Sequence, residues 1–123
     1  MFSFEKPWWI PGAALLMLAL TGAAQAGELK SLMKDMKTAM NGAMGSAGDA
    51  EFSSYLQRLR LDADRAAKLP YPDNQTDYRE GMRALSADLD KAEQFAKAGD
   101  LAAAKRSLQA ANQTKKRYHH LLN

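Results

Sequence analysis

The chain of 123 residues contains no cysteine. This absence excludes disulfide bridges, thiolate metal sites and covalent attachment of a haem through a Cys-x-x-Cys-His motif. A domain this short must therefore be held together by helix packing or by a bound ligand. Any porphyrin that it carried would be bound non-covalently.

Valine and isoleucine are absent after Ala26, where alanine, leucine, methionine, lysine, arginine, glutamate and glutamine dominate. That composition favours helices over strands. Glycine and proline are sparse and divide the chain into segments of roughly 28–44, 50–68, 76–98 and 100–122. The predicted N-caps are Asp49, Thr76 and Asp100. Gly99 is predicted to be a C′ residue in the left-handed conformation.

The first 26 residues contain an apolar run followed by Ala24-Gln25-Ala26. An apolar region before a small-x-small site is typical of a cleaved secretory signal peptide. Pro11 and Gly12 interrupt the run, which is shorter than the ~20 residues of a membrane-spanning helix. We therefore expect residues 1–26 to be a signal peptide and 27–123 to be an exported domain with no membrane attachment after cleavage.

Charge is mildly positive and mixed along the chain. The mature part has 16 Lys+Arg against 13 Asp+Glu, because Glu5 and Lys6 belong to the signal. A nucleic-acid-binding protein would need basic residues clustered on one face, so no nucleic-acid partner is expected. The pairs Asp62/Asp64 and Asp88/Asp90 do not share a helix face at their i,i+2 spacing, and we interpret them as solvated charge.

Each helical segment carries apolar residues at three- and four-residue spacing. Short connections make consecutive helices antiparallel, so the predicted fold is an all-α, up-down-up-down four-helix bundle. The predicted stripes are Leu29, Met33, Met36, Met40 and Met44; Phe52, Tyr55, Leu56, Leu59, Ala63 and Ala66; Tyr78, Met82, Leu85, Leu89, Ala92 and Ala96; and Leu101, Ala104, Leu108, Ala111, Tyr118 and Leu122.

This topology places Met33 and His119 at one end of the bundle. Met33 lies about 7 Å from the start of its helix and His119 about 6 Å from the end of the last. Helical projection turns His119 inward and His120 outward. A thioether and an imidazole could then hold a metal ion or a haem, with Met36 as the second choice for the sulfur ligand.

Other interpretations of these residues remain open. A methionine stripe often serves only to fill a core, and an inward histidine often only makes a hydrogen bond. A periplasmic copper-binding protein is one alternative, because thioethers and imidazole suit Cu(I). A cofactor-free helical bundle is another. No nucleophile, general acid or phosphate-binding loop indicates an enzyme, and nothing requires more than a monomer.

Several segments resemble the cytochrome b562 family: Asp77-Tyr78-Arg79-Glu80-Gly81-Met82, Leu89-Asp90-Lys91-Ala92 through Gly99, Lys115-Lys116-Arg117-Tyr118-His119, and Leu29-x-x-x-Met33 after a signal peptide. The resemblance covers the mature chain and implies a periplasmic electron carrier with one non-covalent haem b, ligated by Met33 and His119, that serves unknown redox partners.

Two features depart from the family pattern. The aromatic residues that usually line the haem on the third helix correspond here to Tyr78 and Met82. The chain also ends without the family's terminal basic residue, and Lys115 could extend toward a haem propionate instead.

Overall fold

The computed structural model describes residues 26–71 and 74–122, and the side chains of 119–122 lie outside the described part. The predicted signal peptide, apart from residue 26, also lies outside it. The described residues form a first helix over 26–44, followed by α2 (Asp49–Lys68), α3 (Gln75–Lys97) and α4 (Leu101–Leu122). These bounds confirm the four predicted segments to within two residues at each end.

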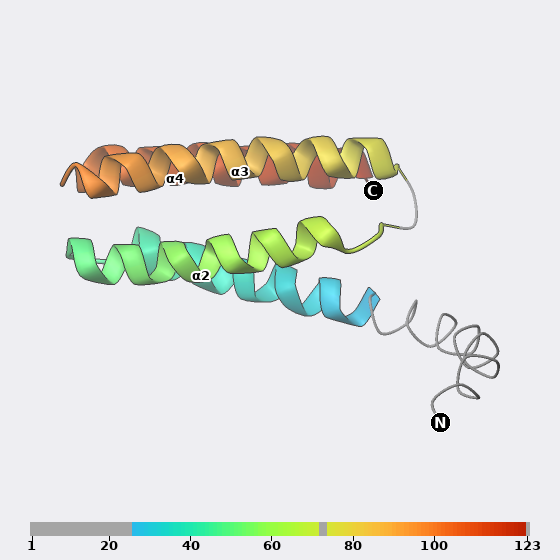
Figure 1. The fold of residues 1–123 in the computed structure, drawn as a ribbon, viewed down its shortest axis with the longest axis horizontal. Helices are drawn as coiled ribbons and strands as arrows, with labels where there is room; N and C mark the ends of the chain where they lie inside the picture. The colour runs from blue at the N-terminus through green and yellow to red at the C-terminus, as the bar shows by residue number, and fades with distance from the viewer. Residues whose placement is uncertain (1–25, 72–73, 123) are drawn as a thin grey trace, which may run out of the picture.

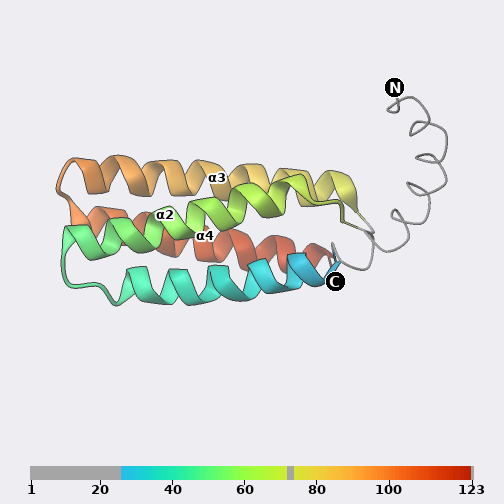
Figure 2. The same ribbon diagram turned by 60° about the horizontal axis from the view of Figure 1, so that its bottom comes forward.

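The four helices form two layers, with α3 and α4 in one and the first helix and α2 in the other (Figure 1). The turned view shows each helix running antiparallel to the next, so that the first helix begins at the end of the bundle where α4 finishes (Figure 2). The up-down-up-down four-helix bundle predicted from the sequence is therefore confirmed.

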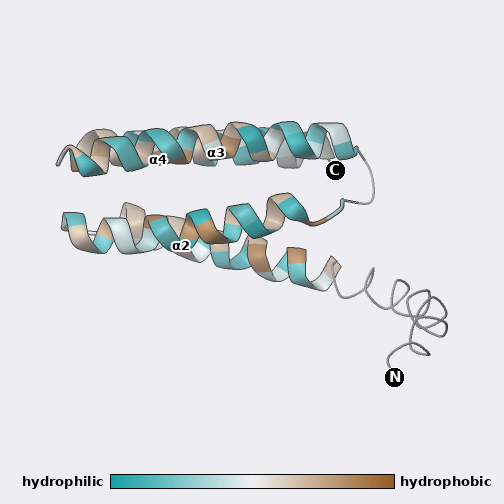
Figure 3. Ribbon diagram, in the orientation of Figure 1, coloured by the Kyte–Doolittle hydropathy of each residue, from teal (hydrophilic) through white to brown (hydrophobic). Residues whose placement is uncertain are grey.

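Every helix carries both hydrophobic and hydrophilic residues along its length (Figure 3). The core contains most of the predicted stripe, and its largest fully buried side chains are Tyr78, Phe52, Met36, Leu59, Leu89 and Leu108. The stripes omitted six buried helical residues: Leu32, Ala39, Ala43, Gly81, Ala103 and Thr114. Six residues of the predicted stripes are only partly buried: Met33, Met44, Tyr55, Ala96, Leu101 and Tyr118. The first helix packs against two neighbours, so its buried arc is wider than one stripe and is centred near Met36.

The turn between α3 and α4 follows the predicted chemistry. Gly99 has φ +79°, and its N–H donates to the Ala96 carbonyl, while the Asp100 N–H donates to the Phe95 carbonyl. This pair of bonds forms a Schellman motif. The Asp100 carboxylate accepts from the Ala103 N–H at 3.0 Å, which confirms it as an N-cap.

The other two predicted N-caps are wrong. Asp49 is the first residue of α2, whose N-cap is Gly48, and Thr76 lies inside α3, whose N-cap is Asn74 in the left-handed region at φ 51°. Gly48 has no side chain to form a cap, and the Asn74 side chain makes no capping hydrogen bond. At the start of α2 a side chain further along the helix forms a hydrogen bond instead: the Glu51 carboxylate accepts from the Ala47 N–H. The sequence could not show that each helix starts one residue earlier.

None of the helices in the described residues is both long enough and apolar enough to span a membrane.

Candidate cofactor site

The register between the first helix and α4 can be measured from side chains that meet across their seam. The Lys105 ammonium donates to the Ser46 carbonyl at 2.6 Å. Nearer the chain ends, Lys115 lies close enough to Lys37 for their charges to interact. Along two antiparallel helices one residue number rises as the other falls, so residues at the same level have numbers with a nearly constant sum. The sum is 151 for the first pair and 152 for the second. A cavity of about 390 Å³ on the same seam follows this register, lined by Met40, Asn41, Met44, Leu108, Gln109, Asn112 and Gln113.

The same register, continued along α4, brings position 119 level with Met33, because these two numbers also add to 152. The backbone of His119 belongs to the last turn and a half of α4, and its side chain lies outside the described residues. Met36 is level with position 116, about 4.5 Å deeper in the bundle at the helical rise per residue. The backbone of position 119 and Met33 therefore lie at the same depth in the bundle, as the helical rise predicts.

Met33 and Met36 differ in burial. Met36 is 2 % exposed and is packed on all sides in the core. Met33 is partly buried and packs against the edge of that core. A thioether at the edge can reach a ligand that enters from the bundle end, whereas the Met36 sulfur is enclosed by existing core contacts.

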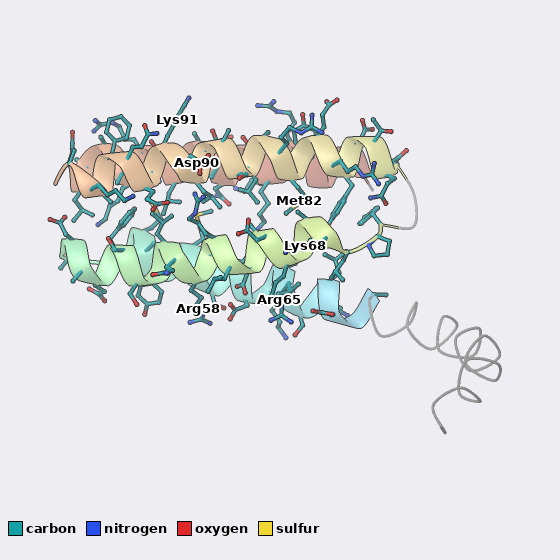
Figure 4. All side chains as sticks on the ribbon, viewed as in Figure 1. Arg58, Arg65, Lys68, Met82, Asp90 and Lys91 are labelled. Atoms are coloured by element: carbon teal, nitrogen blue, oxygen red, sulfur yellow. The ribbon has the colours of Figure 1, made fainter. Side chains whose placement is uncertain are left out.

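The α3 residues predicted beside the cofactor are buried near this end. Tyr78 is 2 % exposed and Met82 is 9 % exposed. Met82 points from α3 toward the layer formed by the first helix and α2 (Figure 4). The Tyr78 hydroxyl donates to the Ala66 carbonyl at 2.5 Å, and its ring stacks on Tyr71 with centroids 4.8 Å apart. Burial, followed by the nearby Tyr71, raises the pKa of Tyr78 to about 12, so its hydroxyl stays protonated.

A close contact between α3 and α4 occurs one turn from Tyr78. A Cβ added to Gly81 would lie 2.8 Å from Cγ of Tyr118 and 3.0 Å from its Cβ. Gly81 is thus the residue that allows Tyr118, the neighbour of His119, to pack against α3. The sequence analysis missed this role. A glycine inside a helix, where it costs about 1 kcal/mol relative to alanine, was the available signal.

Lys115, the residue predicted to reach a haem propionate, is partly buried on α4. Burial lowers the pKa of its ammonium group, and the positive charges of Lys37 and Lys116 lower it further. An anionic group bound near Lys115 would relieve that repulsion and favour the charged amine. A haem propionate is such a group.

The interpretation of the two acidic pairs as solvated charge holds for Asp64, which is exposed, and is wrong for the other three carboxylates, which interact with side chains of neighbouring helices. Asp88 accepts a hydrogen bond from the Thr114 hydroxyl at 2.8 Å, and Asp90 forms an ion pair with Arg60 at 2.7 Å. Helical spacing had assigned these carboxylates to solvent, but helices pack closely enough for side chains at the seam to bond across it.

Asp62 belongs to a cluster on the seam between the first helix and α2. Arg58 binds Asp35 through two nitrogens, and hydrogen bonding to Arg58 and then to Asp62 lowers the pKa of Asp35 to about 2. Burial, followed by the interaction with Asp35, raises the pKa of Asp62 to about 6. One oxygen of Asp62 is buried without a hydrogen-bond partner among the described residues.

The residues at this end fit a haem better than a hard metal ion. The available sulfur donor is the thioether of Met33, the buried wall on α3 is formed by Tyr78 and Met82, and Lys115 can neutralise a carboxylate. The described residues hold no group of three or more histidine, aspartate or glutamate side chains able to bind a metal ion. A methionine and a histidine are one of the ligand pairs that hold haem iron in proteins, and burial of the surrounding wall is one of the means by which a protein tunes that iron.

Comparison with known proteins agrees with the resemblance seen in the sequence. The family model described as cytochrome b562 matches residues 28–123. A search of curated proteins found no match. The cytochrome b562 family binds non-covalent haem b. The matched region takes in all four helices and each predicted ligand and wall residue, and the chain therefore belongs to the cytochrome b562 family.

Proposed function

We propose that this chain is a periplasmic one-electron carrier in which Met33 and His119 bind the iron of haem b from opposite sides. The family provides the coarser statement, a haem-binding electron-transfer cytochrome. The observation that carries the finer proposal is the register of the first helix against α4, which makes position 119 level with Met33.

Each proposed ligand has a distinct role. The Met33 thioether would bind the iron through its sulfur from the partly buried edge of the first helix. The His119 imidazole would bind it through a ring nitrogen from the last turns of α4. When bound, the haem supplies one-electron exchange between ferric and ferrous iron. A neutral thioether stabilises the ferrous state relative to a second imidazole and so raises the reduction potential.

The remaining site residues exclude water and hold charge. Tyr78 and Met82 present buried surface from α3, and the bond from Tyr78 to the Ala66 carbonyl fixes the ring. Lys115 is proposed to bind a propionate, because a carboxylate would offset the burial and repulsion that lower its pKa. If Met33 and His119 both held the iron, the haem would supply electron exchange and would not bind a substrate, so we propose a carrier and not an enzyme.

Export rests on the pattern of residues 1–26 and on the family, whose members are typically periplasmic. The mature protein is proposed to be a monomer whose redox partners are other periplasmic proteins. The mass of the protein recovered from the periplasmic fraction tests this: cleavage after Ala26 predicts a chain that begins at Gly27.

The ligands are tested by titrating the mature protein with haemin and recording oxidised and reduced visible spectra. The wild-type protein should give low-spin spectra with one haem per chain. Met33→Ala and His119→Ala should each lose the low-spin form. Met36→Leu is the matched control, since it removes a neighbouring thioether with little change of volume, and it should keep the wild-type spectrum.

Two outcomes would replace the proposal. If Met36→Leu loses the low-spin form and Met33→Ala keeps it, Met36 is the sulfur ligand. If the wild-type protein takes up copper but no haem, the copper-binding alternative is correct.

A further inference from the structure

Lysines from both helices line the seam between the first helix and α4 near the chain ends. We call this group the lysine seam; its members are Lys30, Lys34, Lys37, Lys115 and Lys116. All are exposed except Lys115, which is partly buried. None of them forms an ion pair with a described side chain.

Helical spacing places the lysines of the first helix on the side that faces α4. Lys30, Lys34 and Lys37 are followed at the next turn by Asn41, which lines the cavity shared with α4. On α4, Lys116 lies four residues beyond Asn112, another residue of that cavity. The two rows therefore meet: burial lowers the pKa of Lys115, and the nearby positive charges of Lys37 and Lys116 lower it further.

The acidic residues of the first helix lie on its other side. Glu28 pairs with Arg65 at 3.0 Å and Asp35 pairs with Arg58, both across the seam with α2. Arg58 and Arg65 are seen on that side of α2 in Figure 4. Positive charge on the lysine seam is thus not offset by carboxylates of its own helix.

The α4 helix concentrates positive charge further. It contains five lysine and arginine residues and no aspartate or glutamate. The other mature residues hold 11 basic and 13 acidic side chains. The net positive charge of the protein is therefore carried by α4, and the lysine seam adds three more lysines beside the final turns of that helix.

The lysine seam also lies at the same depth along the bundle as the proposed ligands. Lys30, Lys34 and Lys37 lie within about 6 Å of Met33 along the helix axis, at the rise of an α-helix. Lys116 lies one turn before His119. A partner held on this surface would lie close to the end of the bundle that holds the haem.

We propose that the lysine seam is the docking surface for a small acidic redox protein, a proposal that rests on the electron-carrier function above. Charge complementarity selects the partner and speeds the encounter. One electron passes between the docked proteins, one of them being oxidised as the other is reduced, and no bond is made or broken.

A protein partner fits this surface better than an anionic membrane does. Stable membrane binding needs apolar side chains that insert beside the basic ones. The large hydrophobic residues that are exposed in the described part are Leu61 and Phe95, on α2 and α3, away from the lysine seam.

The test is an NMR titration of the ¹⁵N-labelled, haem-loaded protein with an acidic flavodoxin as the probe. Shifts are expected at amides 30–37 and 112–117, and binding should weaken as ionic strength rises from about 0.01 to about 0.1 M, where the screening length falls from about 30 to about 10 Å. Lys34→Gln/Lys116→Gln should weaken binding about fivefold to thirtyfold at low salt.

Lys91→Gln/Lys97→Gln is the matched control. It removes the same charge from α3, where Lys91 points away from the bundle (Figure 4), and it should leave the dissociation constant within twofold. Equal weakening by both double variants would mean that net charge, and not the lysine seam, governs binding, which overturns the proposal.

Other outcomes separate this proposal from the electron-carrier function. Shifts on the lysine seam without electron transfer would retain the docking surface and reject the carrier. Electron transfer with shifts on α2 or α3 would retain the carrier function and reject the lysine seam as the docking surface. Cosedimentation with vesicles of equal parts phosphatidylglycerol and phosphatidylcholine, lost in Lys34→Gln/Lys116→Gln, together with no flavodoxin binding, would assign the surface to a membrane instead.

Discussion

Gly81→Ala places a methyl group in a close contact between α3 and α4 at the cofactor end. The new Cβ would lie 2.8 Å from Cγ of Tyr118 and 3.0 Å from Cδ1. These atoms are near the root of the side chain, so the tyrosine cannot swing away without moving α4. Overpacking of this kind costs about 1 to 3 kcal/mol, and alanine returns about 1 kcal/mol of helix propensity. The net expectation is a loss of about 0 to 2 kcal/mol in the free energy of unfolding.

A double-mutant cycle with Tyr118→Ala isolates this contact. In the Tyr118→Ala background the added methyl group meets only a Cβ, so Gly81→Ala should stabilise the protein by up to about 1 kcal/mol. Urea denaturation followed by circular dichroism gives the four free energies. Gly81→Ala should also weaken haem binding, because Tyr118 adjoins His119. A stabilisation of about 1 kcal/mol with Tyr118 in place would refute the close-contact argument.

Three further substitutions test the site and the seams. Tyr78→Phe removes the bond to the Ala66 carbonyl, which also accepts from the Leu69 N–H, and should lower the free energy of unfolding by about 1 kcal/mol in urea; no change would show that the bond contributes nothing. Asp62→Asn should stabilise the protein more near pH 7 than near pH 4, because the raised pKa of Asp62, about 6, means that its contribution is present at low pH and lost as pH rises through 6. The partly exposed carboxyl limits this gain to about 1 kcal/mol, and thermal melts at both pH values that shift equally would contradict it. Lys115→Gln should lower haem affinity severalfold in competition titrations, and the loss should shrink as the pH rises through the lowered pKa of Lys115; an unchanged affinity would remove Lys115 from the propionate site.

The features that follow from local chemistry could be predicted from the sequence. Four helices, their order and the Gly99-Asp100 turn depend on composition, spacing and capping, and the structure confirms them. The depth match of Met33 with position 119 needed only the helical rise and antiparallel order.

Features that depend on how closely the helices approach one another could not be predicted. Gly81 beneath Tyr118 and the Thr114 bond to Asp88 arise from pairings between separate helices. The same limit explains why Asp62 was assigned to solvent: i,i+2 spacing describes one helix, whereas the carboxyl is partly buried by a second helix.

The most direct test of Met33 as the iron ligand is the proton NMR spectrum of the reduced, haem-loaded protein. A methionine bound to ferrous haem has its methyl group over the porphyrin ring, so ring current shifts that resonance far upfield. We expect one such resonance, present in Met36→Leu and absent in Met33→Leu. A resonance that survives in Met33→Leu, or none in the wild-type protein, would contradict the proposed ligation.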